Sequence, residues 1–315
     1  MSHDVDVKFY PGWTRKAITF SIDDGILDMD KRFMDTLEPY GIRGTFNLCS
    51  NRLTAMSPEE YREFYRGHEI ANHCKYHPAA FIDGEEYDIS DDPFSPATAD
   101  TKKLYSYDGE DGLYHAVRPW GGWMKRATTD AYIRLVEESH CELEAIFGEG
   151  SVRCFIWPYD RPANKRLTDY VDAIPYYYSD RVNSCVGIDP KIHFAPPSSE
   201  RFFLSARQKN ILEMAASFEA LPDDGELKFF CFGVHSIDYD KADKWGDLLT
   251  FAKTYGARPE DYFYATVGEI YDYAEATRRV VITDTEIKNP TKINLYIKIN
   301  GERRVLKAER SIPLG

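Results

Sequence analysis

The segment from Ala17 to Gly25 constrains this chain most, because an apolar strand pattern runs directly into two adjacent carboxylates. Asp23 and Asp24 occupy the end of the expected strand, and a glycine follows them. Two neighbouring like charges repel each other and resist burial, so the segment is a poor choice for a purely structural core. The pattern makes chemical sense if one carboxylate binds a metal ion while the other moves protons. The structural alternative is that the two aspartates are an N-capping pair at the start of a helix.

A histidine pair later in the chain supplies matching ligands. The sequence Asn-His-Cys-Lys-Tyr-His-Pro places His73 and His77 four residues apart, a spacing at which two imidazoles can meet one ion. One Asp and two His form a ligand set suited to zinc, and a spare carboxylate beside them suits a metal-assisted hydrolase. Two structural histidines remain the alternative. Cys74 could be a thiolate ligand, but as the neighbour of His73 it is expected to point elsewhere, as a buried thiol.

Length and charge exclude several classes of function. The 315 residues suffice for one large α/β barrel or for two smaller domains. A net charge of −13 disfavours nucleic acid and anionic membranes as partners. No apolar stretch approaches the roughly 20 residues of a membrane span, and the N-terminus lacks a secretory pattern. The 6 cysteines contain no C-x-x-C pair, which suits reduced thiols. We therefore predict a cytoplasmic protein without nucleic-acid or membrane partners.

Strand and helix patterns alternate along most of the chain, which predicts parallel βα units. Residues 79–126 are rich in Asp, Gly, Ser and Pro, and we expect a long irregular insertion there. After residue 278 strand patterns follow one another without helices, and Asn300-Gly301 predicts a hairpin turn. We predict an α/β-barrel domain over residues 1–277 and a small antiparallel β appendage over residues 278–315. Expected helices cover 27–40, 57–65, 128–147, 208–221, 244–255 and 267–276, and expected strands cover 42–48, 69–72, 152–157 and 227–234.

Four of the expected strands end in residues that can carry chemistry. In a parallel α/β barrel the carboxyl ends of the strands converge on one mouth, where catalytic groups collect. The strand ends are Asp23-Asp24, His73, Trp157-Pro158-Tyr159 and His235. The structural alternative is that His235 is a core histidine and that Trp157 and Tyr159 are packing residues.

These motifs resemble those of the polysaccharide deacetylases of the NodB-homology type. The resemblance covers roughly residues 10–275 and implies a distorted (β/α) barrel of the polysaccharide deacetylase type. The first two motifs are specific in combination, and the later ones are weaker. The matching segments are Thr19 to Gly25, Gly41 to Phe46, His73 to Pro78, Gly233 to Ser236 and Tyr264 to Ile270.

The resemblance implies one divalent metal ion held by Asp24, His73 and His77. Zinc fits this set best, and cobalt, nickel or manganese would also fit. Asp23 would act as general base toward a water molecule, and His235 would protonate the leaving amine. Acetate and a free amine would be the products.

Trp157, Pro158 and Tyr159 would contact substrate, with the Tyr159 backbone N–H near the developing oxyanion. The chain departs from the family in the same region. The third family motif usually supplies an arginine that steadies the catalytic Asp, and here Ile156 stands in its place. Arg161 or Arg181 could substitute for it. The Gly-Val-His-Ser-Ile-Asp segment resembles an intracellular branch of the family.

The resulting hypothesis is a metal-dependent hydrolase of non-peptide C–N bonds that removes acetyl groups from an N-acetylated sugar or polysaccharide. One alternative is a hydrolase of a small cyclic amide or ureide on the same fold. Another is a catalytically weak carbohydrate-binding relative, suggested by the missing arginine. The expected partner is a carbohydrate or another small amide substrate. The C-terminal strands could pack on the barrel, form a homo-oligomer, or do both.

Overall fold

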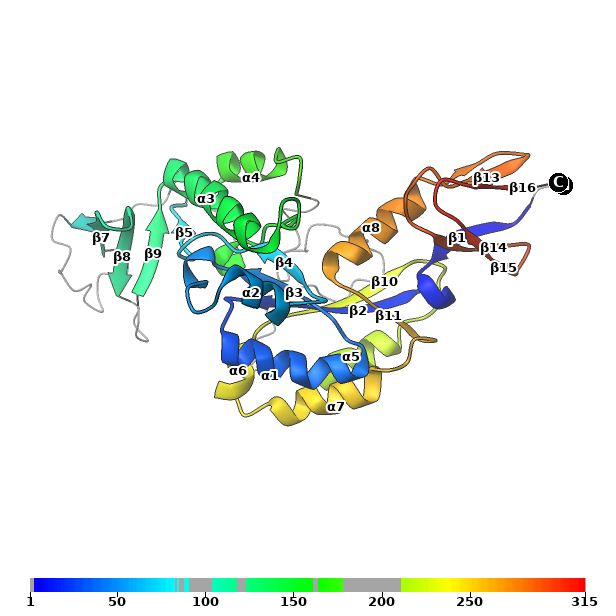
Figure 1. The fold of residues 1–315 in the computed structure, drawn as a ribbon, viewed down its shortest axis with the longest axis horizontal. Helices are drawn as coiled ribbons and strands as arrows, with labels where there is room; N and C mark the ends of the chain where they lie inside the picture. Colours follow the sequence, from blue (N-terminus) through cyan, green and yellow to red (C-terminus); the bar gives the residue numbers. More distant parts are fainter. Residues whose placement is uncertain are drawn as a thin grey trace. The chain divides into compact units, whose positions relative to one another are not determined.

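The structure is a computed structural model that describes residues 3–82, 84, 88–90, 104–117, 123–160, 164–177 and 211–314 (Figure 1). It divides into two compact units. The first unit contains Met1–Thr45, Gly67–Glu69 and Ser184–Gly315, and the second contains Phe46–Arg66 and Ile70–Asn183. Each unit is described by itself.

The core of the first unit is strand β2 (Lys16–Asp23), which pairs in parallel with two later strands. Strand β10 (Lys228–His235) follows β2 from the pair Lys16↔Lys228 to the pair Asp23↔His235, and β11 (Tyr262–Tyr264) also pairs with β2. Every residue of β2 after Lys16 is buried. Burial along the whole length of a strand is typical of a parallel strand that is covered on both faces.

Helices cover both faces of these strands (Figure 1). In the view of Figure 1, α8 (Val267–Arg278) lies above β2. The helices below it are α1 (Leu27–Leu37), α5 (Ile211–Glu219), α6 (Ser236–Lys241) and α7 (Trp245–Tyr255). The ring of Phe20 on β2 contacts those of Phe33, Phe232 and Phe251 with centroid distances of 5.2, 5.9 and 5.5 Å. These edge-on contacts join α1, β10 and α7 into one aromatic core.

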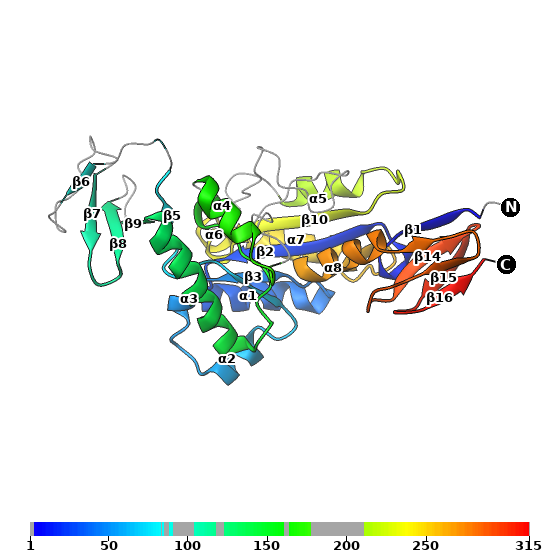
Figure 2. The same ribbon diagram turned by 90° about the horizontal axis from the view of Figure 1, so that it is seen from above.

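The C-terminal residues form the predicted antiparallel appendage. The predicted turn joins β14 (Leu295–Ile299) to β15 (Glu302–Leu306), with φ of 51° at Asn300 and 80° at Gly301. The N-terminal strand β1 (Val5–Phe9) also pairs with β14, which the sequence did not predict (Figure 2). A second small sheet contains β12 (Val281–Ile282), β13 (Glu286–Lys288) and β16 (Ser311–Pro313). The domain boundary after residue 277 stays a prediction.

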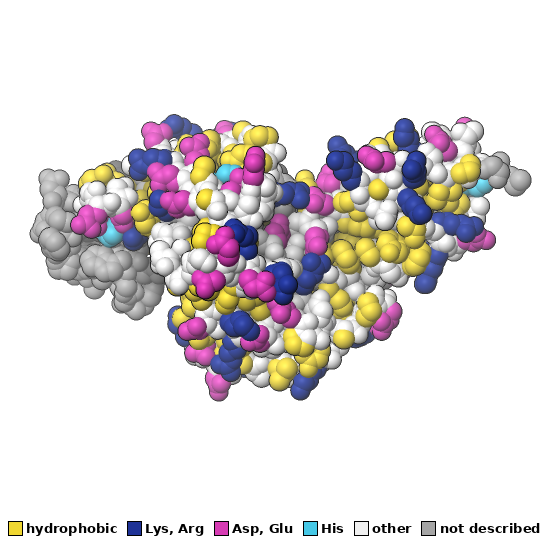
Figure 3. Space-filling view, in the orientation of Figure 1, with side chains coloured by type: hydrophobic (Ala, Val, Ile, Leu, Met, Phe, Trp, Pro, Cys, Tyr) yellow, Lys and Arg dark blue, Asp and Glu magenta, His cyan; other side chains and the backbone are white. Residues whose placement is uncertain are grey.

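Aromatic contacts join this appendage to the rest of the first unit. The short 3₁₀ helix η1 (Pro11–Trp13) places the Trp13 ring edge-on against Tyr296 of β14 at 4.8 Å. The hydroxyl of Tyr273 on α8 accepts a hydrogen bond from the Tyr296 N–H at 2.9 Å. Figure 3 shows hydrophobic side chains gathered on this face of the first unit, next to the strands of the appendage.

The described residues of the second unit include three helices and most of two short strands. Strands β3 (Thr45–Leu48) and β4 (Glu69–Asn72) each begin with one residue that belongs to the first unit, and the His73 N–H donates to the Leu48 carbonyl at 3.0 Å. Helix α2 (Pro58–Phe64) starts with a capping box between Ser57 and Glu60. Helix α3 (Thr129–Phe147) packs against α2 and against α4 (Lys165–Asp172). The 3₁₀ turns η3 (Ser50–Arg52) and η4 (Pro158–Asp160) also belong to the second unit, whereas η2 (Glu38–Tyr40) belongs to the first.

Two expectations need correction. The described part of residues 79–126 is not irregular, because its strands form a sheet of order β5-β9-β8-β7-β6. The predicted strand 152–157 is reduced to one bridge between Asn72 and Phe155. Pro158 has no N–H to donate and Tyr159 has a φ of 58°, so the chain turns away after the bridge. The five strands are β5 (Ala79–Ala80), β6 (Asp88–Ser90), β7 (Leu104–Asp108), β8 (Leu113–Val117) and β9 (Trp123–Ala127).

Within the described ranges, no helix combines the length and the apolar character needed to cross a membrane.

Candidate active site

The two adjacent aspartates lie at the carboxyl end of β2, in the first unit. Asp23 is buried, with 2% of its surface exposed, and Asp24 is part-buried. The chain leaves the strand through two left-handed residues, Asp24 with φ of 86° and Gly25 with φ of 68°. A non-glycine residue in this region costs on the order of 1–3 kcal/mol, and such strain concentrates at functional sites. The turn is therefore a feature that a purely structural strand end would not need.

His235 lies beside these aspartates, because the register of β10 places it opposite Asp23. Its Nε2 is 3.8 Å from Oδ2 of Asp24. Its Nδ1 donates to Oδ2 of Asp238 at 3.1 Å, since the carboxylate can only accept. A carboxylate on Nδ1 fixes both the orientation of the ring and the nitrogen that faces Asp24.

The electrostatic environment of His235 favours its protonated form. Burial alone would lower the pKa of His235. The hydrogen bond to Asp238 and the negative charges of Asp23 and Asp24 outweigh burial and raise the pKa to about 9. The ring therefore carries two protons at neutral pH and is suited to donate one.

In the second unit, His73 and His77 form a pair, with ring centroids 4.7 Å apart. Each offers a ligand atom, and these two atoms lie within 4.8 Å of each other. His73 is buried, and its Nδ1 donates to the Ile156 carbonyl at 2.8 Å. The lone pair of the ring is therefore on Nε2. A histidine whose other nitrogen donates to a backbone carbonyl is the usual arrangement for a metal ligand.

The turn between the two histidines is left-handed rather than helical. Cys74, Tyr76 and His77 have φ values of 62°, 66° and 51°. Side-chain amides hold this turn, because Oδ1 of Asn72 accepts from the Cys74 N–H at 2.8 Å and Oδ1 of Asn51 accepts from the Tyr76 N–H at 3.0 Å. The sequence predicted the pairing of the histidines but not the backbone that produces it.

Cys74 is fully buried, and burial raises the pKa of its thiol well above the usual range. This environment favours the neutral thiol over a thiolate ligand.

The three predicted substrate-binding residues differ in exposure. Trp157 and Pro158 are buried, and the Trp157 ring packs against Tyr132 and Phe155 at 5.9 and 5.0 Å. Tyr159 is part-exposed, and its ring centroid is 4.7 Å from that of His77. Of the three, Tyr159 is the side chain placed against a predicted ligand.

Ile156, which stands where the family has an arginine, contributes through its backbone carbonyl to His73. Arg161 and Arg181, the two predicted substitutes, lie outside the described residues.

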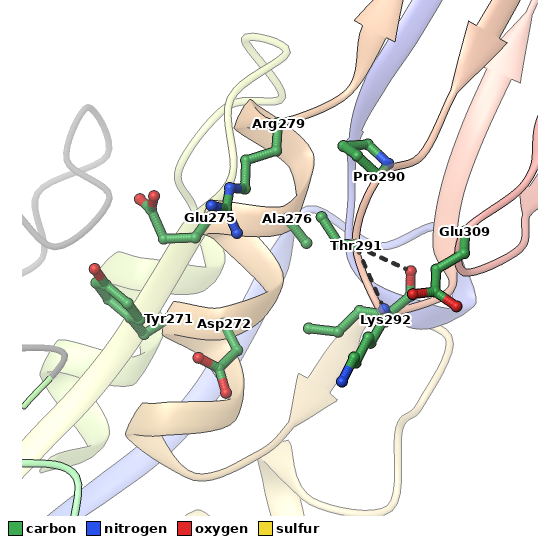
Figure 4. Close-up of a pocket in the computed structure, with 10 residues that line it drawn as sticks. Tyr271, Asp272, Glu275, Ala276, Arg279, Pro290, Thr291, Lys292 and Glu309 are labelled. Carbon is green, nitrogen blue, oxygen red and sulfur yellow. Dashed lines mark hydrogen bonds between the residues drawn. The ribbon is translucent and has the colours of Figure 1, made fainter. Parts of the chain in front are cut away.

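Two other places in the described residues can be compared with this set. A pocket of about 670 Å³ lies between α8 and the segment that leads into β14, where Ala276 faces Thr291 (Figure 4). None of the predicted site residues lines it. Asp108, Asp111 and His115 on the β7–β8 hairpin also form a group of potential ligands, but the Lys125 ammonium already binds Asp111 at 2.8 Å.

The family model described as Polysaccharide deacetylase matches residues 12–179, more than half of the 315 residues. No curated protein matches the chain.

The chain is also similar to several solved structures, among them the following three. The Xyl-CE4 domain of a multidomain xylanase from the hindgut metagenome of Trinervitermes trinervoides is 14% identical, with a TM-score of 0.45, over 84% of this chain and 92% of that one. A family 4 acetyl xylan esterase from Clostridium thermocellum is 13% identical, with a TM-score of 0.47, over 81% and 90%. A peptidoglycan deacetylase from Bacillus subtilis is 14% identical, with a TM-score of 0.42, over 84% and 95%. All three scores are below 0.5, so the assignment rests on the family match.

Proposed function

Because this chain belongs to the polysaccharide deacetylase family of hydrolases, which act on carbon–nitrogen bonds other than peptide bonds, we propose that it deacetylates an N-acetylated sugar or polysaccharide with the help of one divalent metal ion. The same family match confirms the predicted fold class, the (β/α) barrel of this family. Among the described residues, the strands form open sheets and do not close into a complete barrel.

The proposed metal ligands are Asp24, His73 and His77. Support comes from the donor set, one carboxylate and two imidazoles, which suits zinc and also cobalt, nickel or manganese. It comes also from the Nδ1 hydrogen bond of His73 to a carbonyl, which leaves Nε2 as the ligating nitrogen. When bound, such an ion lowers the pKa of a water molecule and polarises the carbonyl of the acetamide.

The acid–base roles fall to residues of the first unit. Asp23, at the strand end next to Asp24, would accept the proton of the attacking water. His235 would give its proton to the nitrogen that leaves as the amine. The observation that carries this assignment is the β2–β10 register, which places a histidine with a raised pKa beside the aspartate pair.

Substrate contacts are assigned by exposure. Tyr159 would contact the sugar or the acetyl group beside His77. Trp157 and Pro158 are buried and would hold the backbone next to Tyr159 in place. A cytoplasmic location and a homo-oligomeric state stay predictions.

Two measurements on the purified protein test the proposal: the metal content, and acetate release from chitooligosaccharides. We expect about one divalent ion per chain, loss of activity on chelation and recovery when zinc or cobalt is added back. Asp24→Ala should remove the ion and lower kcat by at least about 100-fold, because the activated water is lost. Asp28→Ala, an exposed residue on α1, is the matched control and should behave like the wild type.

Each alternative function has its own outcome in this experiment. Tight binding of the oligosaccharide without acetate would indicate a carbohydrate-binding relative. A protein that binds no metal but opens a cyclic amide or ureide would indicate the other alternative. Either result would reject the proposed deacetylase.

A further inference from the structure

We infer that Asp30 is a positioning residue for His235 and acts through Ser236; this inference rests on the proposed function, in which His235 is the general acid. Asp30 lies in the first turn of α1, six residues after Asp24, and takes no part in the chemistry proposed above. Sequence patterns give it no role, because an Asp near the start of a helix is common.

The contact joins two segments that are far apart in the sequence. Oδ1 of Asp30 accepts a hydrogen bond from the Ser236 hydroxyl at 2.6 Å. Both residues are fully buried, with 0% of their surface exposed. Ser236 directly follows His235 and is the first residue of α6. The bond therefore connects α1, which starts just after the aspartate pair, to the point where β10 turns into α6.

Burial makes this contact selective for one geometry. A carboxylate removed from water is costly unless it is hydrogen-bonded, and hydrogen bonds to a charged group are shorter and stronger than neutral ones. The Ser236 hydroxyl therefore has one strongly favoured place. Since α6 has only six residues, Ser236–Lys241, fixing its first residue also constrains the backbone of the turn that carries Asp238.

The consequence for His235 is indirect but specific. The position of the ring is set by the backbone of β10, and its orientation is set by the hydrogen bond to Asp238 on α6. Strand β10 ends at His235 and α6 begins at Ser236, so Ser236 lies at the junction of the two. If the turn shifts, the Nδ1 hydrogen bond and the direction of Nε2 change together. Proton donation requires close positioning, and a displacement of about 1 Å can cost about 100-fold in rate. Asp30 is neither a proposed metal ligand nor a proposed substrate contact, so metal binding and substrate binding should change little.

The test compares Ser236→Ala and Asp30→Asn with the wild type in acetate release from chitooligosaccharides. Ser236→Ala should lower kcat by about tenfold or more, with KM and bound metal within about twofold of the wild type. Asp30→Asn keeps the volume and an acceptor oxygen, so it should retain more activity than Asp30→Ala. The control is Thr277→Val on α8, which removes another buried hydroxyl, one that donates to the Ala274 carbonyl at 2.7 Å, and should leave kcat unchanged.

A readout independent of turnover completes the test. In NMR spectra of the ¹⁵N-histidine-labelled protein, the ring signals of His235, assigned with His235→Asn, should move in Ser236→Ala and stay in place in Thr277→Val. An active wild type with unchanged kcat and unchanged ring signals in a folded Ser236→Ala would overturn the inference alone. A wild type that releases no acetate would reject the proposed function, and the role of Asp30 would fall with it.

Discussion

Asp24, Tyr76, His77 and Tyr159 all hold left-handed backbone conformations that residues with side chains rarely adopt. Each costs on the order of 1–3 kcal/mol, which the surrounding structure must offset. At the histidine turn the offset includes the hydrogen bonds that Oδ1 of Asn72 and Oδ1 of Asn51 accept from the Cys74 and Tyr76 N–H groups. The side chains of Asn51 and Asn72 therefore stabilise the turn between His73 and His77, although neither is a proposed metal ligand.

Asn51→Ala should weaken metal binding although Asn51 contacts no metal. Without its side chain the Tyr76 N–H loses its acceptor, and the left-handed turn before His77 loses support. We expect the zinc affinity to fall by about 10- to 100-fold, the range found for residues that support ligands. Competition with a chromophoric chelator measures this affinity. An unchanged affinity would show that the turn holds itself.

Activity should depend on pH through His235. Its pKa is raised to about 9, above the ordinary 6.5, so the ring stays protonated through neutral pH and loses its proton as the pH rises past 9. We therefore expect kcat to fall on the alkaline side. Asp238→Asn removes the hydrogen-bonded carboxylate, which lowers the pKa, and the alkaline limb should move down by about one pH unit or more. A limb at the same pH in both proteins would assign it to another group.

At the level of elements, the close approach of α7 to the η2 turn depends on Gly256. A Cβ there would lie 2.5 Å from both the Ala252 carbonyl oxygen and the Tyr40 Cβ. Gly256→Ala should therefore lower the free energy of unfolding by about 2 kcal/mol or more. Gly246→Ala, near the start of α7 and with no atom within 4 Å of the added Cβ, should be neutral or stabilising by up to about 1 kcal/mol. Urea denaturation measures both, and equal effects would contradict the packing argument.

Elements with local signals were predictable from the sequence. The capping box of Ser57 and Glu60 marks the start of α2, and Asn300-Gly301 marks the hairpin. The absence of a full strand at 152–157 was not predictable. Its pairing is limited to one bridge before the left-handed Tyr159, and no local sequence pattern reveals that conformation. The sheet within residues 79–126 was missed because its short strands have little periodicity.

The same distinction applies to the candidate site. Asp23, Asp24, His73, His77 and His235 were predicted from motifs at strand ends. Asp238 could have been found, since a residue three positions after His235 on a following helix can reach back to it. Asp30 could not, because its partner Ser236 is 206 positions away and only the fold joins them.

At the scale of the whole molecule, the appendage contributes to the stability of the first unit. Strand β1 pairs with β14, and the buried side chains of Leu295 and Ile297 lie in that sheet. Removing residues 279–315 would expose this surface and leave β1 without its partner strand. Each large apolar side chain contributes about 1.5–3 kcal/mol when buried. We expect the shortened chain to melt at least about 5 °C lower by calorimetry. An unchanged melting temperature would instead mark residues 279–315 as an independent module.

The pairing of Lys16 with Lys228 has a consequence for biosynthesis. On the ribosome, the apolar β2 segment emerges long before β10 has been translated. The last residue of the second unit is Asn183, so that unit is fully translated while β10, β11 and α8 of the first unit are still missing. During most of its translation the nascent chain therefore exposes an apolar strand edge that is prone to aggregation. We expect chaperones to bind this segment until β10 has been translated and pairs with β2.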